Sequence, residues 1–232
     1  MMVTKKLLSF IFLSFLTGGT CMAQVKGDIR AGVNFSNVVA KDRDGKVADT
    51  ESVPGLYVGL GVNVPIWRDF SVHPALVYAR RGFKQNGDAS HIGWGRDFET
   101  KSSYLELPVD IVYSPKIGLG NLILGAGPYV GYGTGGKWKT EGPVLIGDIM
   151  MEGQGALKFQ NDLSYRGDQD YAYAKPWDYG WHVKVGYALF GKYAVQMEIQ
   201  RSIANLDAKW GDYPPGGNIK NKSMGISVAY TF

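Results

Sequence analysis

Apolar and polar residues alternate along eight separate segments of this chain, and this alternation constrains its fold more than any other feature. A repeat of two residues places the apolar side chains on one face of a β-strand and the polar side chains on the other. After residue 24, no stretch keeps the apolar spacing that an amphipathic helix requires. The sequence therefore predicts an all-β fold whose strands cover residues 29–36, 56–66, 70–78, 105–113, 122–133, 181–189, 193–200 and 224–232.

The composition of the two strand faces indicates contact with lipid rather than with water. A soluble barrel carries many Lys and Glu residues on its outer face, and these are scarce in the eight segments. The polar face consists mainly of Gly, Ser and Ala, which are small enough to crowd inside a narrow lumen. The apolar face ends in aromatic residues such as Trp181 and Tyr230, and aromatic girdles of this kind are typical of transmembrane barrels.

The connections between the segments alternate strictly between long and short. Long connections cover residues 40–53, 84–101, 135–178 and 207–220, and short ones lie at 67–69, 114–120 and 191–192. With an even number of strands, the first strand can pair antiparallel with the last, which leaves no unpaired edge in the bilayer. We therefore predict an eight-stranded antiparallel transmembrane β-barrel with long outer loops and short periplasmic turns.

The N-terminal residues have the layout of a secretory signal. Lys5 and Lys6 precede a largely apolar run, residues 7–16, which is about half as long as the ~20 residues of a transmembrane helix. Cleavage after Ala23 assigns residues 1–23 to a signal peptide and residues 24–232 to the barrel domain. Lipidation of Cys21 is the alternative, although Gly18 stands where a lipobox usually has an aliphatic residue. Removal of the signal also removes the only cysteine, which excludes disulfides and thiolate chemistry in the mature chain.

The charges of the chain are nearly balanced. The 25 Lys and Arg residues exceed the 21 Asp and Glu residues, and removal of Lys5 and Lys6 lowers the formal charge from +4 to +2. A protein that binds nucleic acid would instead carry a clustered basic face. We predict no nucleic-acid partner.

Several charged residues alternate with the apolar residues of their strands, and these positions face the lumen. Buried charges are tolerated only when they are paired. We therefore predict a lumen charge network in which three bases face three acids: Arg30, Arg81 and Lys184 with Glu106, Asp110 and Glu198. A path for protons or ions is the alternative role of this set.

No motif in the sequence predicts a catalytic residue, a metal site or a cofactor. Gly131, Gly133 and Gly136 spell the GxGxxG pattern of dinucleotide-binding loops, but Gly142 and Pro143 argue against the helix that should follow. We interpret the match as a coincidence within a glycine-rich strand.

The three histidines and the polar residues of the last loop have ordinary structural interpretations. His73 and His182 have lumen parity, and we expect both to be hydrogen-bonded interior residues. His91 lies in a long loop, and we interpret it as solvated rather than as part of a catalytic triad at the rim. The polar residues of the last loop do not have the spacing of a calcium-binding loop. We interpret them as ordinary loop residues: Asp207, Asp212, Asn218 and Asn221.

Three short stretches resemble known outer-membrane proteins. The final stretch, MGISVAYTF with Tyr230 and Phe232, resembles the C-terminal signal that the barrel assembly machinery reads. Residues 29–37, IRAGVNFSN, and residues 104–113, YLELPVDIVY, resemble the PorT-like outer-membrane β-barrel family. This resemblance implies a small barrel of the OmpA/OmpX-like type in the cell outer membrane, with outer-membrane lipid and the assembly machinery as partners. One group of the family takes part in a protein secretion system.

These observations favour a non-enzymatic barrel whose surface loops contact an extracellular or periplasmic protein partner, in a surface, adhesion or secretion-accessory role. The alternative is transport of small solutes through the barrel, and a more distant one is a lipid-modifying enzyme at the rim. Strand number separates the first two, because side chains just fill an eight-stranded interior, whereas solute channels usually have about 16 to 18 strands.

Overall fold

The computed structural model describes residues 25–87, 90–92, 94–142, 144–146, 149–151, 153–162, 171–209 and 211–232. The predicted signal peptide, residues 1–23 with Cys21, lies outside the described residues.

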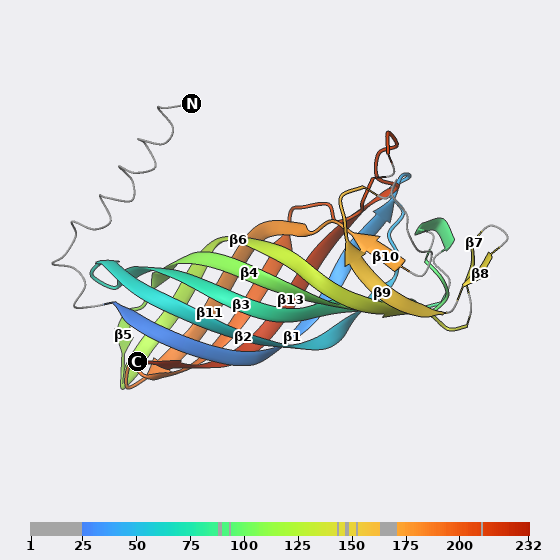
Figure 1. Ribbon diagram of the computed structural model, residues 1–232. Coiled ribbons are helices and arrows are strands. Elements are labelled where there is room, and N and C mark those ends of the chain that lie inside the picture. The colour runs from blue at the N-terminus through green and yellow to red at the C-terminus, as the bar shows by residue number, and fades with distance from the viewer. Residues whose placement is uncertain are drawn as a thin grey trace, which may run out of the picture.

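Eight long strands form a closed antiparallel barrel (Figure 1). Each strand pairs with the next one along the barrel, and β13 pairs with β1 to close the ring. The predicted eight-stranded all-β barrel is thereby confirmed. The barrel strands are β1 (Lys26–Asp42), β2 (Thr50–Trp67), β3 (Phe70–Gln85), β4 (Glu99–Tyr113), β6 (Gly120–Lys139), β11 (Trp177–Leu189), β12 (Tyr193–Ser202) and β13 (Gly217–Thr231).

The closing pair of strands is continuous over its whole length. The register runs from Asp28 opposite Thr231 to Asp42 opposite Gly217 without a shift. Beyond it, the backbone N–H of Phe232 donates a hydrogen bond to the carbonyl oxygen of Gly27 at 2.9 Å. Because every strand is paired on both sides, the barrel wall exposes no row of unsatisfied backbone groups to lipid.

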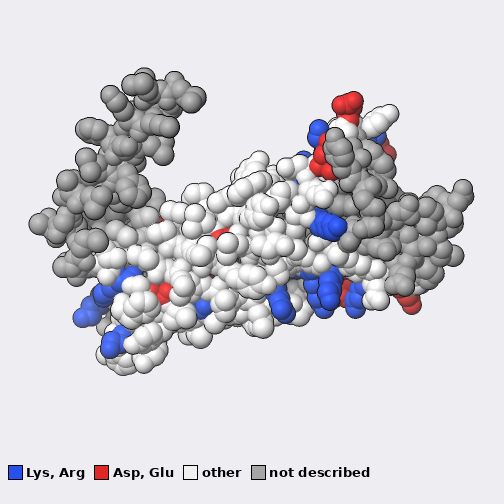
Figure 2. Space-filling view, viewed as in Figure 1, with Lys and Arg blue, Asp and Glu red and all other residues white. Residues whose placement is uncertain are grey.

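The two faces of each strand are those that the alternation predicts. On β2, Leu56, Val58 and Leu60 are 52–61% exposed on the outer wall, whereas Tyr57 between them is 4% exposed and points into the barrel. Figure 2 shows the same result at the surface, where the middle of the wall is almost free of charge and Lys and Arg gather toward its two ends. The uncharged middle is the part that a bilayer covers.

The predicted bounds of the outer loops are wrong in part, because several barrel strands continue beyond the apolar band. Strand β4 begins at Glu99 inside the predicted loop 84–101, and β6 extends to Lys139 inside the predicted loop 135–178. Short elements occupy much of what remains: η2 (Ser90–Ile92), β7 (Val144–Ile146), β8 (Ile149–Met151), β9 (Gln154–Phe159) and β10 (Tyr171–Ala174). Strand β9 pairs antiparallel with β6, and β10 pairs parallel with β9. The short turns carry only β5 (Lys116–Ile117), at the end opposite β9 and β10 (Figure 1).

Inside the outer end of the barrel, an apolar cluster replaces the polar lining. We call it the aromatic cap; its buried members are Val38, Ala40, Ala48, Phe83, Phe98 and Trp138, with Ile92, Trp94 and Ile219 packed against them. The rings of Trp94 and Phe98 stack with centroids 5.4 Å apart, and those of Phe83 and Trp94 are 4.8 Å apart. On β4 and β6 the outward side chains at this level are charged, so this part of the barrel has an apolar interior and a polar exterior, as a soluble barrel does.

The described helical structure is confined to the three residues of η2. Nowhere in the described ranges is there a helix of the length and apolar character needed to cross a membrane.

Candidate functional site in the barrel lumen

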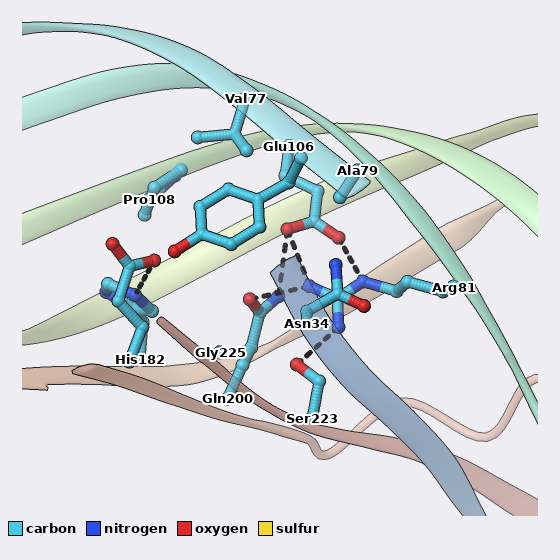
Figure 3. A pocket seen from close by; sticks show the side chains of 12 residues that line it. Asn34, Val77, Ala79, Arg81, Glu106, Pro108, His182, Gln200, Ser223 and Gly225 are labelled. Carbon is cyan, nitrogen blue, oxygen red and sulfur yellow. Dashed lines mark hydrogen bonds and ion pairs between the residues drawn. The ribbon is translucent and has the colours of Figure 1, made fainter. Parts of the chain in front are cut away.

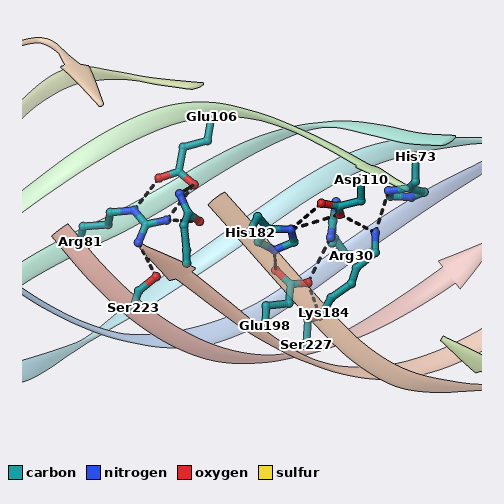
Figure 4. Close-up of polar contacts among 11 residues, drawn as sticks. Arg30, His73, Arg81, Glu106, Asp110, His182, Lys184, Glu198, Ser223 and Ser227 are labelled. Atoms are coloured by element: carbon teal, nitrogen blue, oxygen red, sulfur yellow. Dashed lines mark hydrogen bonds and ion pairs between the residues drawn. The ribbon is translucent and has the colours of Figure 1, made fainter. Parts of the chain in front are cut away.

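The six residues of the predicted charge network all point into the lumen. Arg30 lies on β1, Arg81 on β3, Glu106 and Asp110 on β4, Lys184 on β11 and Glu198 on β12. Asp110 is completely buried, and the side chain of Glu198, at 13% exposure, is the most accessible of the six. The structure joins them into two separate groups of contacts (Figure 4).

The first group centres on a two-pronged ion pair between Arg81 and Glu106. Nε of Arg81 donates to Oε1 of Glu106 at 2.5 Å, and Nη2 donates to Oε2 at 2.8 Å. Gln200 accepts a further hydrogen bond from Nη2 of Arg81 at 2.7 Å and donates one to Oε2 of Glu106 at 3.2 Å. Ser223 accepts the bond from Nη1. Such a fork-to-fork pair is stronger and more specific in direction than a single charged hydrogen bond.

The second group is a chain of charges that crosses the lumen. Lys184 contacts Asp110 at 3.0 Å, and Asp110 accepts from Nδ1 of His182 at 2.9 Å. Nε2 of His182 lies 3.4 Å from Glu198, which also accepts from Arg30 at 3.1 Å. Because both ring nitrogens of His182 face carboxylates, the geometry favours the imidazolium form, in which both are donors.

Two residues that the network prediction did not include extend this chain toward the turns. The ammonium group of Lys184 lies 3.0 Å from Nδ1 of His73, and Nε2 of His73 lies 2.6 Å from Oδ2 of Asp28. An ammonium group can only donate, so Nδ1 of His73 accepts and Nε2 carries the proton toward Asp28. Asp28 has the same parity on its strand as Arg30, a signal that could have identified it.

The charges of the two groups cancel when His182 is charged and His73 is neutral. A balanced, hydrogen-bonded set avoids the large cost of a lone buried charge. The cations are Arg30, Arg81, His182 and Lys184, and the anions are Asp28, Glu106, Asp110 and Glu198.

The glycines of the polar face make room for this chain. A Cβ atom on Gly125 would lie 2.7 Å from Cε of Lys184, and one on Gly61 would lie 2.7 Å from Nε2 of His73. Real Cβ atoms do not approach other atoms so closely. The glycine-rich lumen face therefore allows long charged side chains to lie across a narrow barrel.

A cavity of about 30 Å³ lies between the two groups, lined by residues of both, including Arg81, Glu106, His182 and Glu198 (Figure 3). A cavity needs roughly 10–15 Å³ to hold one water molecule. The space therefore suits about two waters and is far too small for a solute.

Other sequence-predicted residues lie apart from this network. Strand β6 continues through Gly131, Gly133 and Gly136 to Lys139, so the GxGxxG pattern lies within a strand and does not open a helix. His91 lies in η2, whereas its predicted neighbour Asp88 is outside the described residues. In the last loop, Asp207 accepts from the backbone N–H of Gly217 at 2.7 Å, and burial raises the pKa of Asp207 above its usual value. The part of the chain that the structure describes contains no group of three or more metal-binding side chains arranged around one point.

The two residues of the predicted assembly signal lie at the end of the barrel that carries the short turns. The side chain of Tyr230 is on the outer wall, where its ring lies 5.3 Å from that of Tyr193 on the neighbouring strand. Phe232 is 72% exposed beyond the end of β13. Recognition by the assembly machinery stays a prediction.

One comparison with known proteins identifies the family of this chain. A family model described as an outer membrane protein beta-barrel domain matches residues 22–208. Among solved structures, the chain is similar to Ail, the attachment invasion locus protein of Yersinia pestis, at 13% identity, with a TM-score of 0.42 and coverage of 90% of this chain and 99% of that chain.

Two further solved structures give similar values. For the outer membrane protease OmpT from Escherichia coli, the identity is 14% and the TM-score 0.41, over 90% of this chain and 96% of that chain. For a major outer membrane protein from Thermus thermophilus, the identity is 11% and the TM-score 0.46, over 90% of this chain and 100% of that chain. No curated protein matches the chain significantly. At these identities and scores, the likenesses carry no argument about activity.

Proposed function

From the premise that this chain belongs to the outer membrane β-barrel domain family and lies in the cell outer membrane, we propose that it is a non-enzymatic barrel that presents its outer loops to a protein partner. The barrel anchors and orients these loops. The partner of the outer loops is extracellular, a periplasmic partner at the short turns is the alternative, and the role is that of a surface, adhesion or secretion-accessory protein.

The observation that supports this proposal is the closed lumen. Side chains from all around the barrel meet in two hydrogen-bonded groups, and the space left between them is about 30 Å³. Above them, the aromatic cap fills the outer end with packed rings. A barrel closed at two levels is suited to hold loops in place rather than to pass solutes, which makes small-solute transport the weaker alternative.

The buried positions of the two lumen histidines argue against a catalytic role for them in the rim-enzyme alternative, for which His91 in η2 stays the one candidate histidine. His73 and His182 are 8% and 3% exposed, and their ring nitrogens contact charged partners inside the barrel. A catalytic residue must reach its substrate. A substrate at the rim would be separated from both rings by the aromatic cap.

The resemblance to PorT-like barrels includes the secretion-accessory form of this role but does not separate it from the others. The two stretches that carry it, residues 29–37 and 104–113, belong to β1 and β4 of the barrel wall. These stretches therefore indicate the barrel fold and not a partner, which must be identified by experiment.

A crosslinking experiment in intact cells tests the loop-display role. A photoreactive amino acid replaces Tyr213, which is 73% exposed in the loop between β12 and β13. The matched control replaces Phe190, which is 71% exposed in the short turn between β11 and β12. We expect one reproducible protein adduct from position 213, identified by mass spectrometry, and none of that identity from position 190.

A second measurement separates display from transport. Purified protein in planar bilayers should show little steady conductance. Large, regular channels of porin size, or an adduct that forms equally from both positions, would overturn the proposal.

A further inference from the structure

The outer wall of the barrel changes from apolar to basic at one level on β3, β4 and β6. Below this level, Tyr78, Leu105 and Tyr132 are 41–45% exposed on the lipid-facing wall. Arg80 follows directly beyond Tyr78 toward the outer loops, whereas Ser103 and Thr134 come before the cations on β4 and β6. We call these cations the basic patch: Arg80, Lys101, Lys137 and Lys139. Figure 2 shows Lys and Arg side chains gathered on the wall beside the outer loops.

The strand register of the basic patch places like charges directly opposite each other. Lys101 on β4 is the cross-strand partner of Lys137 on β6. Like charges in this position destabilise a sheet. Within the barrel, Glu99 offsets the charge of Lys101 but makes no ion pair with Lys137, so this opposition is only partly compensated and the pair is suited to an added anion.

The acids near the basic patch are too few to neutralise it. Glu99 contacts the ammonium groups of both Lys101 and Lys139, each at 2.9 Å. Among the described residues, neither Arg80 nor Lys137 has a carboxylate within ion-pair distance. Four cations against one carboxylate leave a local excess of three positive charges.

Three cations of the basic patch, Arg80, Lys101 and Lys137, line an open hollow of about 730 Å³ in the outer wall. Hydroxyl-bearing residues lie among them, and the other side of the hollow is apolar. The hydroxyl-bearing residues include Ser103 and Thr134, and the apolar ones are Val33, Pro54 and Leu56. The Thr134 hydroxyl already donates to the carbonyl oxygen of Ser103, whereas the Ser103 hydroxyl accepts from Tyr78 and keeps its own proton. Cations and the Ser103 hydroxyl beside an apolar side match a molecule with an anionic head and hydrocarbon chains.

Irregular strand pairing creates the hollow. The register between β4 and β6 shifts at Ser103 and Tyr104, and the register between β2 and β3 shifts between Ser52 and Tyr57. Gly135 lies at the first of these bulges with a φ of +149°, a conformation that a residue with a side chain rarely adopts, and no atom lies within 4 Å of where its Cβ would be. The bulge thus opens the wall where the cations converge.

We propose that the basic patch binds the phosphate groups of a phosphorylated lipid in the outer leaflet, with the acyl chains lying against the lipid-facing wall below. The level of the patch carries this assignment, because the cations begin where the exposed aromatic residues of the wall end, which is where the headgroups of a bilayer lie. A basic side chain near an anionic lipid surface contributes about 1 kcal/mol, so each cation of the patch should strengthen binding about fivefold.

The sharpest test is charge reversal at one position. Lys137→Glu replaces the opposition of two lysines by an attractive pair with Lys101, so the lipid-free barrel in neutral detergent should unfold at the same or a higher temperature. The same variant should lose binding of bisphosphorylated lipid A by more than the roughly fivefold loss of Lys137→Gln. If Lys137 had only a structural role, the unfolding temperature of the lipid-free barrel and the binding of lipid A would fall together.

The binding measurement uses purified full-length protein in neutral detergent, titrated with bisphosphorylated lipid A and followed by the gel-shift unfolding temperature. The matched control variant removes cations at the opposite end of the barrel: Arg68→Gln, Lys116→Gln and Lys192→Gln. We expect lipid A to raise the unfolding temperature of the wild type and of the control variant, but not that of Lys137→Glu. Dephosphorylated lipid A should have no such effect.

Two results would overturn the proposal. One is an equal rise in Lys137→Glu and in the wild type, which would mean that the patch takes no part in binding. The other is an equal rise with inorganic phosphate alone, which would identify a site for soluble anions rather than for lipid.

Discussion

The ammonium group of Lys184 lies 3.0 Å from Oδ2 of Asp110 in the middle of the barrel, with side-chain exposures of 2% and 0%. They lie on β11 and β4, two strands that are not neighbours, since β6 pairs with both. The contact therefore passes over β6 inside the barrel, where Gly125 leaves room for the Lys184 side chain. Together with the Arg81 and Glu106 pair, it closes the barrel interior with charges that neutralise one another.

The buried acid Glu198 should be essential to this closure. Glu198→Ala leaves Arg30 and His182 buried without one of their partners, which should cost roughly 3–5 kcal/mol of unfolding free energy. The gel-shift unfolding temperature should fall, or steady conductance in planar bilayers should rise. Glu51→Ala on the exposed outer part of β2 is the control and should change neither. Unchanged stability and conductance in Glu198→Ala would contradict the interior network.

The aromatic cap should stabilise the outer end of the barrel independently of the membrane. Phe98→Ala removes a ring that packs against Phe83, Trp94 and Trp138, and it should cost about 3–5 kcal/mol. We expect a lower unfolding temperature and faster protease cleavage of the outer segments in whole cells. Tyr213→Ala, at a ring that is 73% exposed, serves as the control. Equal cleavage rates in the two variants would mean that the cap does not hold the outer end together.

The lipid-facing wall should reject charge in its middle. Val185 is outward on β11 between Leu124 and Met197, and Val185→Arg should cost about 2–4 kcal/mol near the bilayer midplane. Ile203→Arg is the matched control, because Ile203 is 58% exposed just beyond the outer end of β12 and should tolerate a charge. Insertion and heat-modifiability on gels measure both. A neutral Val185→Arg would place lipid elsewhere on the molecule.

The terminal residue should act in assembly rather than in stability. Phe232 is 72% exposed, so its deletion removes little buried surface and one terminal hydrogen bond to Gly27. The C-terminal resemblance predicts poorer recognition by the assembly machinery. Outer-membrane abundance should fall and periplasmic degradation should rise, while the protein that does insert should unfold at nearly the wild-type temperature. Ile117→Ala, an exposed apolar change in a short turn, controls for lost surface area. Normal abundance after deletion would argue against the predicted signal.

The sequence alone determined the number of barrel strands, which face of each strand meets lipid and which charges point inward. These properties depend on the parity of neighbouring positions, as with Tyr57 between Leu56 and Val58, and parity is local. The same rule placed Arg30, Glu106 and Lys184 in the lumen without any knowledge of their partners.

Only the tertiary structure decided which groups meet. The pairing of Arg81 with Glu106, the extension of the charge chain to His73 and Asp28, and the opposition of Lys101 and Lys137 depend on the register between strands. Only the structure also shows how far the strands extend beyond the membrane. Outward side chains in water need not be apolar, so the alternation of apolar and polar residues that predicts a strand is lost in this part of the sequence. The aromatic cap was missed for the same reason, since Phe83, Phe98 and Trp138 come together only when three strands close around them.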